Sequence, residues 1–224
     1  MTTWPVEQNA LRAEIVGVGA SLFQRGDVHS TAGNISLRLC SEQGGGFLIT
    51  PTDACLGFLD PAQLAWVDDG GKQQSGERAS KTLALHRRIY AAAPDARCVL
   101  HTHATHLVAL TLQGVWAAND ILPPLTPYQV MKVGHVPLIA YHRPGDPAVA
   151  DAVAAHIAAA KRPLRAVMLE RLGPTVWHDS PAAAMALLEE LEETARLWLL
   201  GARALKPMNE AQIDELRTHF NAPW

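Results

Sequence analysis

The chain has 224 residues, 48% of them hydrophobic, which is enough apolar material for one large domain with a sizeable core. The formal net charge of −3 at pH 7 argues against a dedicated nucleic-acid-binding protein, because affinity for a phosphate backbone requires a basic surface. No stretch of about 20 apolar residues runs unbroken, so we expect no membrane as a partner. We expect a single domain over residues 1–224 and, without a signal-peptide pattern, a cytoplasmic location.

The first part of the chain predicts two helices that flank a group of short strands. Apolar residues at helical spacing predict a helix over 5–24, and the alternation of Ile35, Leu37 and Leu39 predicts a half-buried strand. The glycines at 44–46 indicate a turn that pairs this strand with a second one. The remaining elements expected here are strands at 47–50 and 65–68 and a helix at 81–93.

The second part of the chain predicts further strands and helices in alternation. An apolar run at 98–100 begins as a strand and turns into a helix. Asp146 and Pro147 are typical of a helix start. The later elements expected are strands at 136–141, 166–169 and 175–177 and helices at 146–160 and 181–205. Because tight turns join several strands, the pattern favours a mixed or antiparallel sheet covered by helices over pure βαβ winding.

Two histidines follow the apolar strand at 98–100 directly. His101 and His103 are two residues apart, and such residues in a strand point to one face of the sheet. Two imidazoles on one face can bind a zinc, manganese, iron, cobalt or nickel ion. The alternative is a pair of surface or hydrogen-bonded histidines, and the spacing alone does not decide between these readings.

Several motifs in fixed order resemble the class II aldolase/adducin-like family. They are STAGNISLRL, LITPT, the segment from SK through ALHRRIYAAAPDARCVLHTHATH, and PPLTPYQVMKVG, and the similarity runs from about Leu11 to about Leu200. The segments SKTLALH, VMKVG, YHRPGDP and LEELEETARLWLL resemble the 3-oxo-tetronate 4-phosphate decarboxylase branch. Members of that branch are taken to convert a phosphorylated four-carbon 3-oxo sugar acid into dihydroxyacetone phosphate and CO2.

The resemblance implies a fold class and an assembly. The fold is α/β, a three-layer α/β/α domain with a central mixed, largely antiparallel sheet. The assembly is a homotetramer whose active sites lie between neighbouring subunits. One divalent metal ion per subunit is implied on His101 and His103, with Zn²⁺ expected first and Mn²⁺, Fe²⁺, Co²⁺ or Ni²⁺ as alternatives.

The resemblance also assigns substrate-binding residues. The phosphate-binding residues it implies are Ser30, Thr31, Gly33, Asn34 and Ser80, with Lys81 beside Ser80. A glycine lets backbone N–H groups approach phosphate closely, whereas the alternative for this segment is a simple turn. Tyr128 falls where the aldolases have a tyrosine that reaches into the neighbouring subunit's site as a proton donor.

Two positions depart from the family pattern. Thr82 stands where the aldolases have the carboxylate that acts as their base, and a threonine hydroxyl is not a competent base near neutral pH. Leu172 stands where the family has its third metal-binding histidine, and leucine cannot bind a metal. The candidate replacements are His135, His142 and Glu170, of which the histidines are more simply explained as ordinary ones.

The missing base favours decarboxylation over aldol cleavage. Loss of CO2 from a 3-oxo acid needs an electron sink and a later proton donor, whereas aldol cleavage needs a base to deprotonate a hydroxyl. We therefore expect a metal-dependent decarboxylase with Lys81, Thr82 and Tyr128 in its catalytic site. One alternative is an aldolase that uses another carboxylate, such as Glu77, and another is a non-catalytic adducin-like binding protein.

Overall fold

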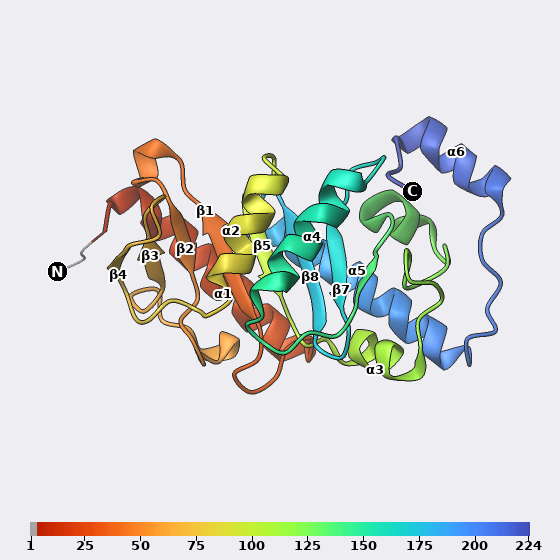
Figure 1. Ribbon diagram of the computed structural model, residues 1–224, viewed down its shortest axis with the longest axis horizontal. Coiled ribbons are helices and arrows are strands. Elements are labelled where there is room, and N and C mark those ends of the chain that lie inside the picture. The colour runs from red at the N-terminus through yellow and green to blue at the C-terminus, as the bar shows by residue number, and fades with distance from the viewer. Residues whose placement is uncertain (1–3) are drawn as a thin grey trace.

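An eight-stranded sheet forms the centre of the computed structural model, which describes residues 4–224 (Figure 1). The strands lie in the order β4-β3-β2-β1-β5-β8-β7-β6, and only β6 and β7 pair in parallel. Their bounds are β1 (Asn34–Arg38), β2 (Phe47–Ile49), β3 (Ala65–Val67), β4 (Gln73–Ser75), β5 (Cys98–His101), β6 (Leu138–Ile139), β7 (Ala166–Leu169) and β8 (Gly173–His178). The predicted mixed, largely antiparallel sheet is confirmed.

Helices cover both faces of the sheet. Figure 1 shows α2 and α4 in front of the strands and α1 and α5 behind them. The α-helices are α1 (Asn9–Arg25), α2 (Leu83–Ala92), α3 (Thr105–Gln113), α4 (Pro147–Ala159), α5 (Pro181–Leu200) and α6 (Glu210–Phe220). Shorter turns of 3-10 helix are η1 (Val6–Gln8), η2 (Ser41–Gln43) and η3 (Leu56–Phe58), and η4 (Gln129–Val133) is a π-helix.

The two faces of the central strands belong to two different apolar cores. On β5, Cys98 and Leu100 pack into the core that includes α1 and α5, whereas Val99 packs into the core that includes α2 and α4. Neighbouring residues of a strand point to opposite faces, so burial of both faces of β5 accounts for the unbroken apolar run Cys98, Val99 and Leu100. This arrangement gives the three layers that the sequence predicts.

Four elements differ from the sequence-based expectation. The strand β4 consists of polar, exposed residues at the sheet edge, so it has no apolar alternation to detect. The strand expected at 136–141 shortens to β6, and the helix expected to reach 205 ends at Leu200 before Gly201. The helix α6 buries only Ile213, which leaves a weak apolar pattern.

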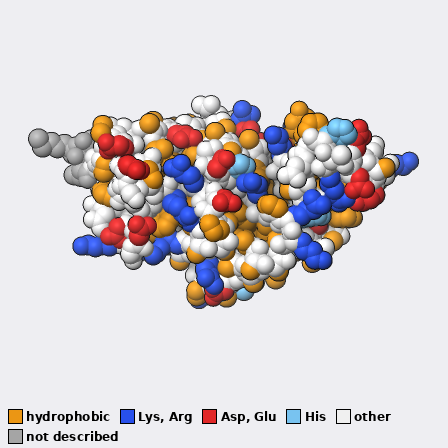
Figure 2. Space-filling view, turned by 90° about the horizontal axis from the view of Figure 1, so that it is seen from above, with side chains coloured by type: hydrophobic (Ala, Val, Ile, Leu, Met, Phe, Trp, Pro, Cys, Tyr) orange, Lys and Arg blue, Asp and Glu red, His pale blue; other side chains and the backbone are white. Residues whose placement is uncertain are grey.

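On the described part of the face in Figure 2, acidic and basic side chains are interspersed and no continuous basic stripe is visible. Among residues 4–224, no helix combines the length and the apolar character needed to cross a bilayer.

Candidate active site

The pairing of β1 with β5 brings the glycine-containing turn beside the histidine pair. Asn34 lies directly opposite His101 in this antiparallel ladder. Gly33 has φ +85°, and a Cβ built on it would lie 2.8 Å from the backbone oxygen of His101. Both the left-handed conformation and the close approach therefore require glycine at this position.

A row of hydrogen bonds links the same turn to the start of α2. The backbone N–H groups of Ile35 and Ser80 donate to Thr50, to its Oγ1 at 3.2 Å and its carbonyl at 3.2 Å respectively. The hydroxyls of Ser80 and Thr82 lie 2.9 Å apart, within hydrogen-bonding distance. Ser80 and Thr82 thus lie near the same end of the strands as Asn34.

The turn itself presents polar groups to its surroundings. Ser30 and Thr31 are exposed, and Ser30 adopts φ 51°, a conformation that costs energy for a residue with a side chain. The amide of Ala32 donates to the carbonyl of His29 at 3.0 Å and closes the turn. Asn34 is buried, and its Oδ1 has no hydrogen-bond partner among the described residues. A buried amide oxygen without a partner suits a site that receives a donor from outside the chain.

The imidazole of His101 is buried and held in one orientation. Its Nδ1 lies 2.9 Å from the carbonyl oxygen of Pro174 and 3.0 Å from Thr175 Oγ1. Because a carbonyl only accepts, Nδ1 carries the proton and Nε2 keeps its lone pair. Burial, and then the neighbouring His103, lowers the pKa of His101 to about 3, so the ring is neutral near pH 7.

His103 lies beside His101 and is only half-buried. The two ring centroids are 5.2 Å apart, with the planes 73° from parallel. Burial, and then His29, lowers the pKa of His103. Two neutral imidazoles at this separation fit one divalent cation as ligands. Within residues 4–224 no group of three histidine, cysteine, aspartate or glutamate side chains is placed to hold an ion.

Leu172 faces the site from the turn after β7. Its side chain lines both the cavity that contains His101 and the hollow that contains His103. His142 and Glu170 line the same cavity as His101, and one oxygen of Glu170 accepts the backbone N–H of Tyr141 at 2.9 Å.

His135 lies away from the histidine pair. Its Nδ1 is 2.6 Å from Asp120 Oδ2, and its ring packs against Trp224 with centroids 4.4 Å apart. It lines a surface pocket with Pro223 that contains neither His101 nor His103, which argues against the expectation that it completes the metal site.

His29 is a neighbour of the pair that sequence reasoning missed. Its ring centroid lies 6.4 Å from that of His103, and both line the same hollow. The residue directly precedes Ser30, so its place in the sequence was the available signal. The buried His86 was also missed, and burial, and then the neighbouring imidazole of His101, lowers the pKa of His86 to about 3.

The remaining predicted residues fall in different places. Lys81 and Thr82 line the cavity that contains His101. Tyr128 precedes η4 and is 60% exposed, and among the described residues it shares no cavity with His101 or His103. Glu77 is exposed and accepts a hydrogen bond from Gln63 Nε2 at 3.0 Å, away from these cavities.

Comparison with known proteins identifies relatives over almost the whole chain. The family described as Class II Aldolase and Adducin N-terminal domain matches residues 13–199. A 3-oxo-tetronate 4-phosphate decarboxylase from Cupriavidus necator is 55% identical, covering 97% of this chain and 99% of that protein. L-fuculose phosphate aldolase from Escherichia coli is 26% identical, covering 94% and 93%. The crystal structure of YgbL from Escherichia coli superposes with a TM-score of 0.86 at 40% identity, covering 95% and 100%.

Proposed function

Since the chain belongs to the class II aldolase and adducin family, we propose that it is a lyase that decarboxylates a phosphorylated four-carbon 3-oxo sugar acid. The products would be dihydroxyacetone phosphate and CO2. One observation carries the choice of reaction: Thr82 is hydrogen-bonded to Ser80 and lines the same cavity as His101, at the position where the aldolases have the carboxylate that acts as their base. The enzyme names of its relatives favour this reading over a non-catalytic adducin-like protein.

The reaction breaks the bond between C1 and C2 of the substrate. The electron pair of that bond moves onto C2 and the adjacent 3-oxo group, while C1 leaves as neutral CO2. A proton then adds to C2 to give the hydroxymethyl group of the product. The site must therefore hold the substrate, stabilise negative charge at the 3-oxo oxygen and supply one proton.

His101 and His103 are the residues that would hold a divalent cation. Such an ion, Zn²⁺ in the first instance, supplies Lewis acidity toward the 3-oxo and neighbouring hydroxyl oxygens when bound. The hydrogen bond from His101 Nδ1 to Pro174 fixes the ring so that Nε2 is available. Leu172 contributes no ligand, so positions around the ion remain open for substrate oxygens.

The turn at 30–34 and Ser80 would bind the phosphate. Exposed hydroxyls of Ser30 and Thr31 and the hydroxyl of Ser80 are neutral donors, and Gly33 allows close approach of the backbone. Lys81 adds a positive charge that attracts the phosphate or the carboxylate. Tyr128 of a neighbouring subunit would deliver the proton to C2 within a homotetramer.

A decarboxylation assay with and without a chelator tests the proposal. The protein is supplied with the 3-oxo acid 4-phosphate, and both CO2 and dihydroxyacetone phosphate are measured. We expect stoichiometric release of both products, loss of activity on chelation and recovery with added Zn²⁺ or Mn²⁺. Full activity in metal-free protein would refute the role of the cation.

An aldolase acting on a sugar phosphate is the second candidate. It is supported by the relatives that include L-fuculose phosphate aldolase. Incubation with a ketose 1-phosphate separates the candidates, since aldol cleavage releases an aldehyde and no CO2. Aldehyde release at a rate above that of CO2 from the acid would favour the aldolase.

A further inference from the structure

A cavity of about 120 Å³ adjoins His101. It is lined by the start of α2, the turn after β7 and the loop between β6 and α4. In the strand order β1-β5-β8-β7-β6, His101 on β5 lies between Asn34 on β1 and the cavity residues Leu169 on β7 and Ile139 on β6. A molecule bound by the turn at one end and by the cavity at the other would cross the histidine pair.

Three basic side chains from two separate segments line the cavity. Lys81 comes from the start of α2, and His142 and Arg143 come from the loop before α4. Among the described residues, the side chains of Lys81 and His142 have no hydrogen bond or ion pair. Arg143 has one loose ion pair, with its Nε 3.8 Å from Asp146 Oδ2, and its side chain is 72% exposed.

The acidic side chains of the cavity are already engaged. Asp146 caps α4, since its Oδ1 accepts the backbone N–H of Ala148 at 3.0 Å. Glu170 accepts the backbone N–H of Tyr141 at 2.9 Å. Lys81 has no ion pair among the described residues, and the 3.8 Å ion pair of Arg143 with Asp146 is long, so both positive charges can act on an anionic ligand. An arginine fork matches a carboxylate especially well.

The rest of the cavity wall is apolar. Leu85, Ile139, Leu169 and Leu172 line it. A charged carboxylate needs the basic side chains in order to enter these surroundings, whereas neutral CO2 does not. The cavity thus combines an anion-binding rim with walls that suit the neutral product.

We propose that Arg143, assisted by Lys81 and His142, binds the substrate carboxylate and selects acid phosphates over neutral sugar phosphates. This inference rests on the proposed function, because it assigns a binding site to the carboxylate, which is the second charged end of the proposed substrate. The carboxylate loses its charge during the reaction, so its contact with Arg143 is stronger in the ground state than in the transition state. Removing Arg143 therefore raises KM more than it lowers kcat.

Two matched probes test the inference without turnover. 4-Phosphoerythronate carries a carboxylate, whereas erythritol 4-phosphate has a hydroxymethyl group in its place. Calorimetric titration of Arg143→Ala should show about 10- to 100-fold weaker binding of the acid and less than about 2-fold change for the alcohol. Arg143→Lys should restore part of the loss. The control is Arg196→Ala, which removes an exposed arginine with a similar partner three residues away, Glu193.

The outcomes separate the inference from the proposed function. Equal losses for both probes, or unchanged binding of the acid, would overturn the carboxylate site. Selective binding of the acid that depends on Arg143, without release of CO2 from the 3-oxo acid, would keep the site and reject the decarboxylase. A KM for the 3-oxo acid that rises in Arg143→Ala while kcat changes little would support both.

Discussion

Two oxygen atoms on β8 hold the ring of His101. They belong to Pro174, which contributes its carbonyl, and to Thr175, which contributes its hydroxyl. Partners of this kind fix the tautomer and direction of a metal-binding imidazole, and their loss typically weakens metal binding about 10- to 100-fold. The affinity of the proposed metal site should therefore depend on residues that never touch the ion.

Thr175→Val tests this dependence. The change removes one of the two oxygen partners of His101 while its nearly equal volume preserves packing. We expect zinc affinity, measured by competition with a chromophoric chelator, to fall about 10-fold. Thr194→Val is the control, because that hydroxyl donates to Glu190 within α5 and should leave zinc affinity unchanged. An affinity that stays the same in both variants would contradict the role of Thr175.

Leu172→His tests the empty ligand position. Leu172 lines the spaces occupied by both imidazoles, so a histidine there is within the same surroundings. A third ligand should tighten zinc binding at least about 10-fold, since catalytic zinc sites use three protein ligands. Leu112→His places a histidine in the hollow of His103 on the exposed side and should have no such effect. Equal affinity of the Leu172→His variant and the unaltered protein would show that the position faces away from the ion.

His86 makes stability depend on pH. It is buried, its Nδ1 lies 2.7 Å from Ser36 Oγ, and its Nε2 has no partner among the described residues. Burial lowers its pKa from 6.5 to about 3, so between these values the unfolded chain binds a proton that the folded chain excludes. The free energy of unfolding should fall as pH decreases through this window, by up to ~1.4 kcal/mol per pH unit and proton.

Denaturant titrations between pH 7 and pH 4 check this effect. His86→Leu should weaken the acid-side fall in stability, although the lost contact with Ser36 costs about 1 kcal/mol at pH 7. His156→Leu, an exposed histidine on α4, should leave the fall unchanged. An equally steep fall in His86→Leu would assign the effect to other groups.

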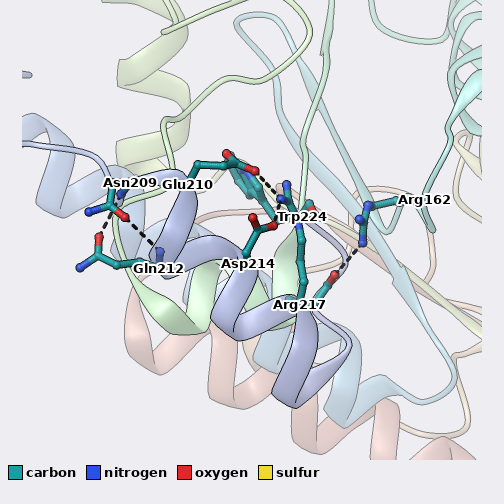
Figure 3. A network of polar contacts seen from close by, with 8 residues as sticks. Arg162, Asn209, Glu210, Gln212, Asp214, Arg217 and Trp224 are labelled. Carbon is teal, nitrogen blue, oxygen red and sulfur yellow. Dashed lines mark hydrogen bonds and ion pairs between the residues drawn. The ribbon is translucent and has the colours of Figure 1, made fainter.

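At the scale of elements, the C-terminal segment packs against the π-helix η4. Val130 of η4 packs against Ile213 of α6 and against Ala222 and Trp224. Figure 3 shows two arginines directed at the chain end, where Arg162 Nη1 donates to the Ala222 carbonyl at 3.1 Å. The second arginine, Arg217, donates from Nε to the Trp224 carbonyl at 2.9 Å. The C-terminal segment therefore packs against η4, which begins directly after Tyr128, and these contacts lie outside the central sheet.

Trp224→Ala measures how much this packing contributes to the free energy of unfolding. The buried indole also packs against His135, so its removal should cost about 3 kcal/mol of unfolding free energy. Phe220→Ala is a matched aromatic control on the exposed side of α6 and should change stability by less than about 0.5 kcal/mol. A similar effect of both changes, measured by denaturant titration, would mean that the indole contributes no specific packing.

The elements also show what the sequence could predict. The strands β1 and β5 follow their apolar patterns. The imidazoles of His101 and His103 are adjacent as expected, but β5 ends at His101, so His103 reaches its neighbour from the following loop and the strand spacing does not explain the contact. The polar edge strand β4 and the largely exposed α6 carry no such pattern. The neighbour His29 joins the site through a turn between α1 and β1, and periodicity does not determine turn geometry.

At the scale of the whole molecule, Tyr128 raises the question of assembly. Its side chain is 60% exposed and shares none of the described cavities beside His101. A proton donor in this position acts only if another subunit brings its site to the tyrosine. The proposed homotetramer and the proposed role of Tyr128 therefore depend on each other.

Mixed assemblies test both together. Tyr128→Phe and His101→Ala should each be nearly inactive alone, with losses of about 100-fold or more. When the two variants are unfolded together and refolded, some sites combine an intact His101 with an intact tyrosine from a neighbour, and activity should return. A mixture of His101→Ala and His103→Ala is the control and should stay inactive. Light scattering should show a mass near four subunits, and no recovery in the first mixture would contradict a shared site.

The pairing of β1 with β5 has a consequence for how the protein matures. Asn34 and His101 are distant along the chain and meet only when this ladder closes, because β2, β3, β4 and α2 lie between β1 and β5 in the sequence. Such long-range pairings form slowly, because the entropy of a large chain loop is lost before the contact stabilises anything. A newly made chain should consequently acquire simultaneous affinity for a metal and a phosphate in one late step. The time at which a refolding chain first binds the metal and the phosphate together would then report when folding is complete.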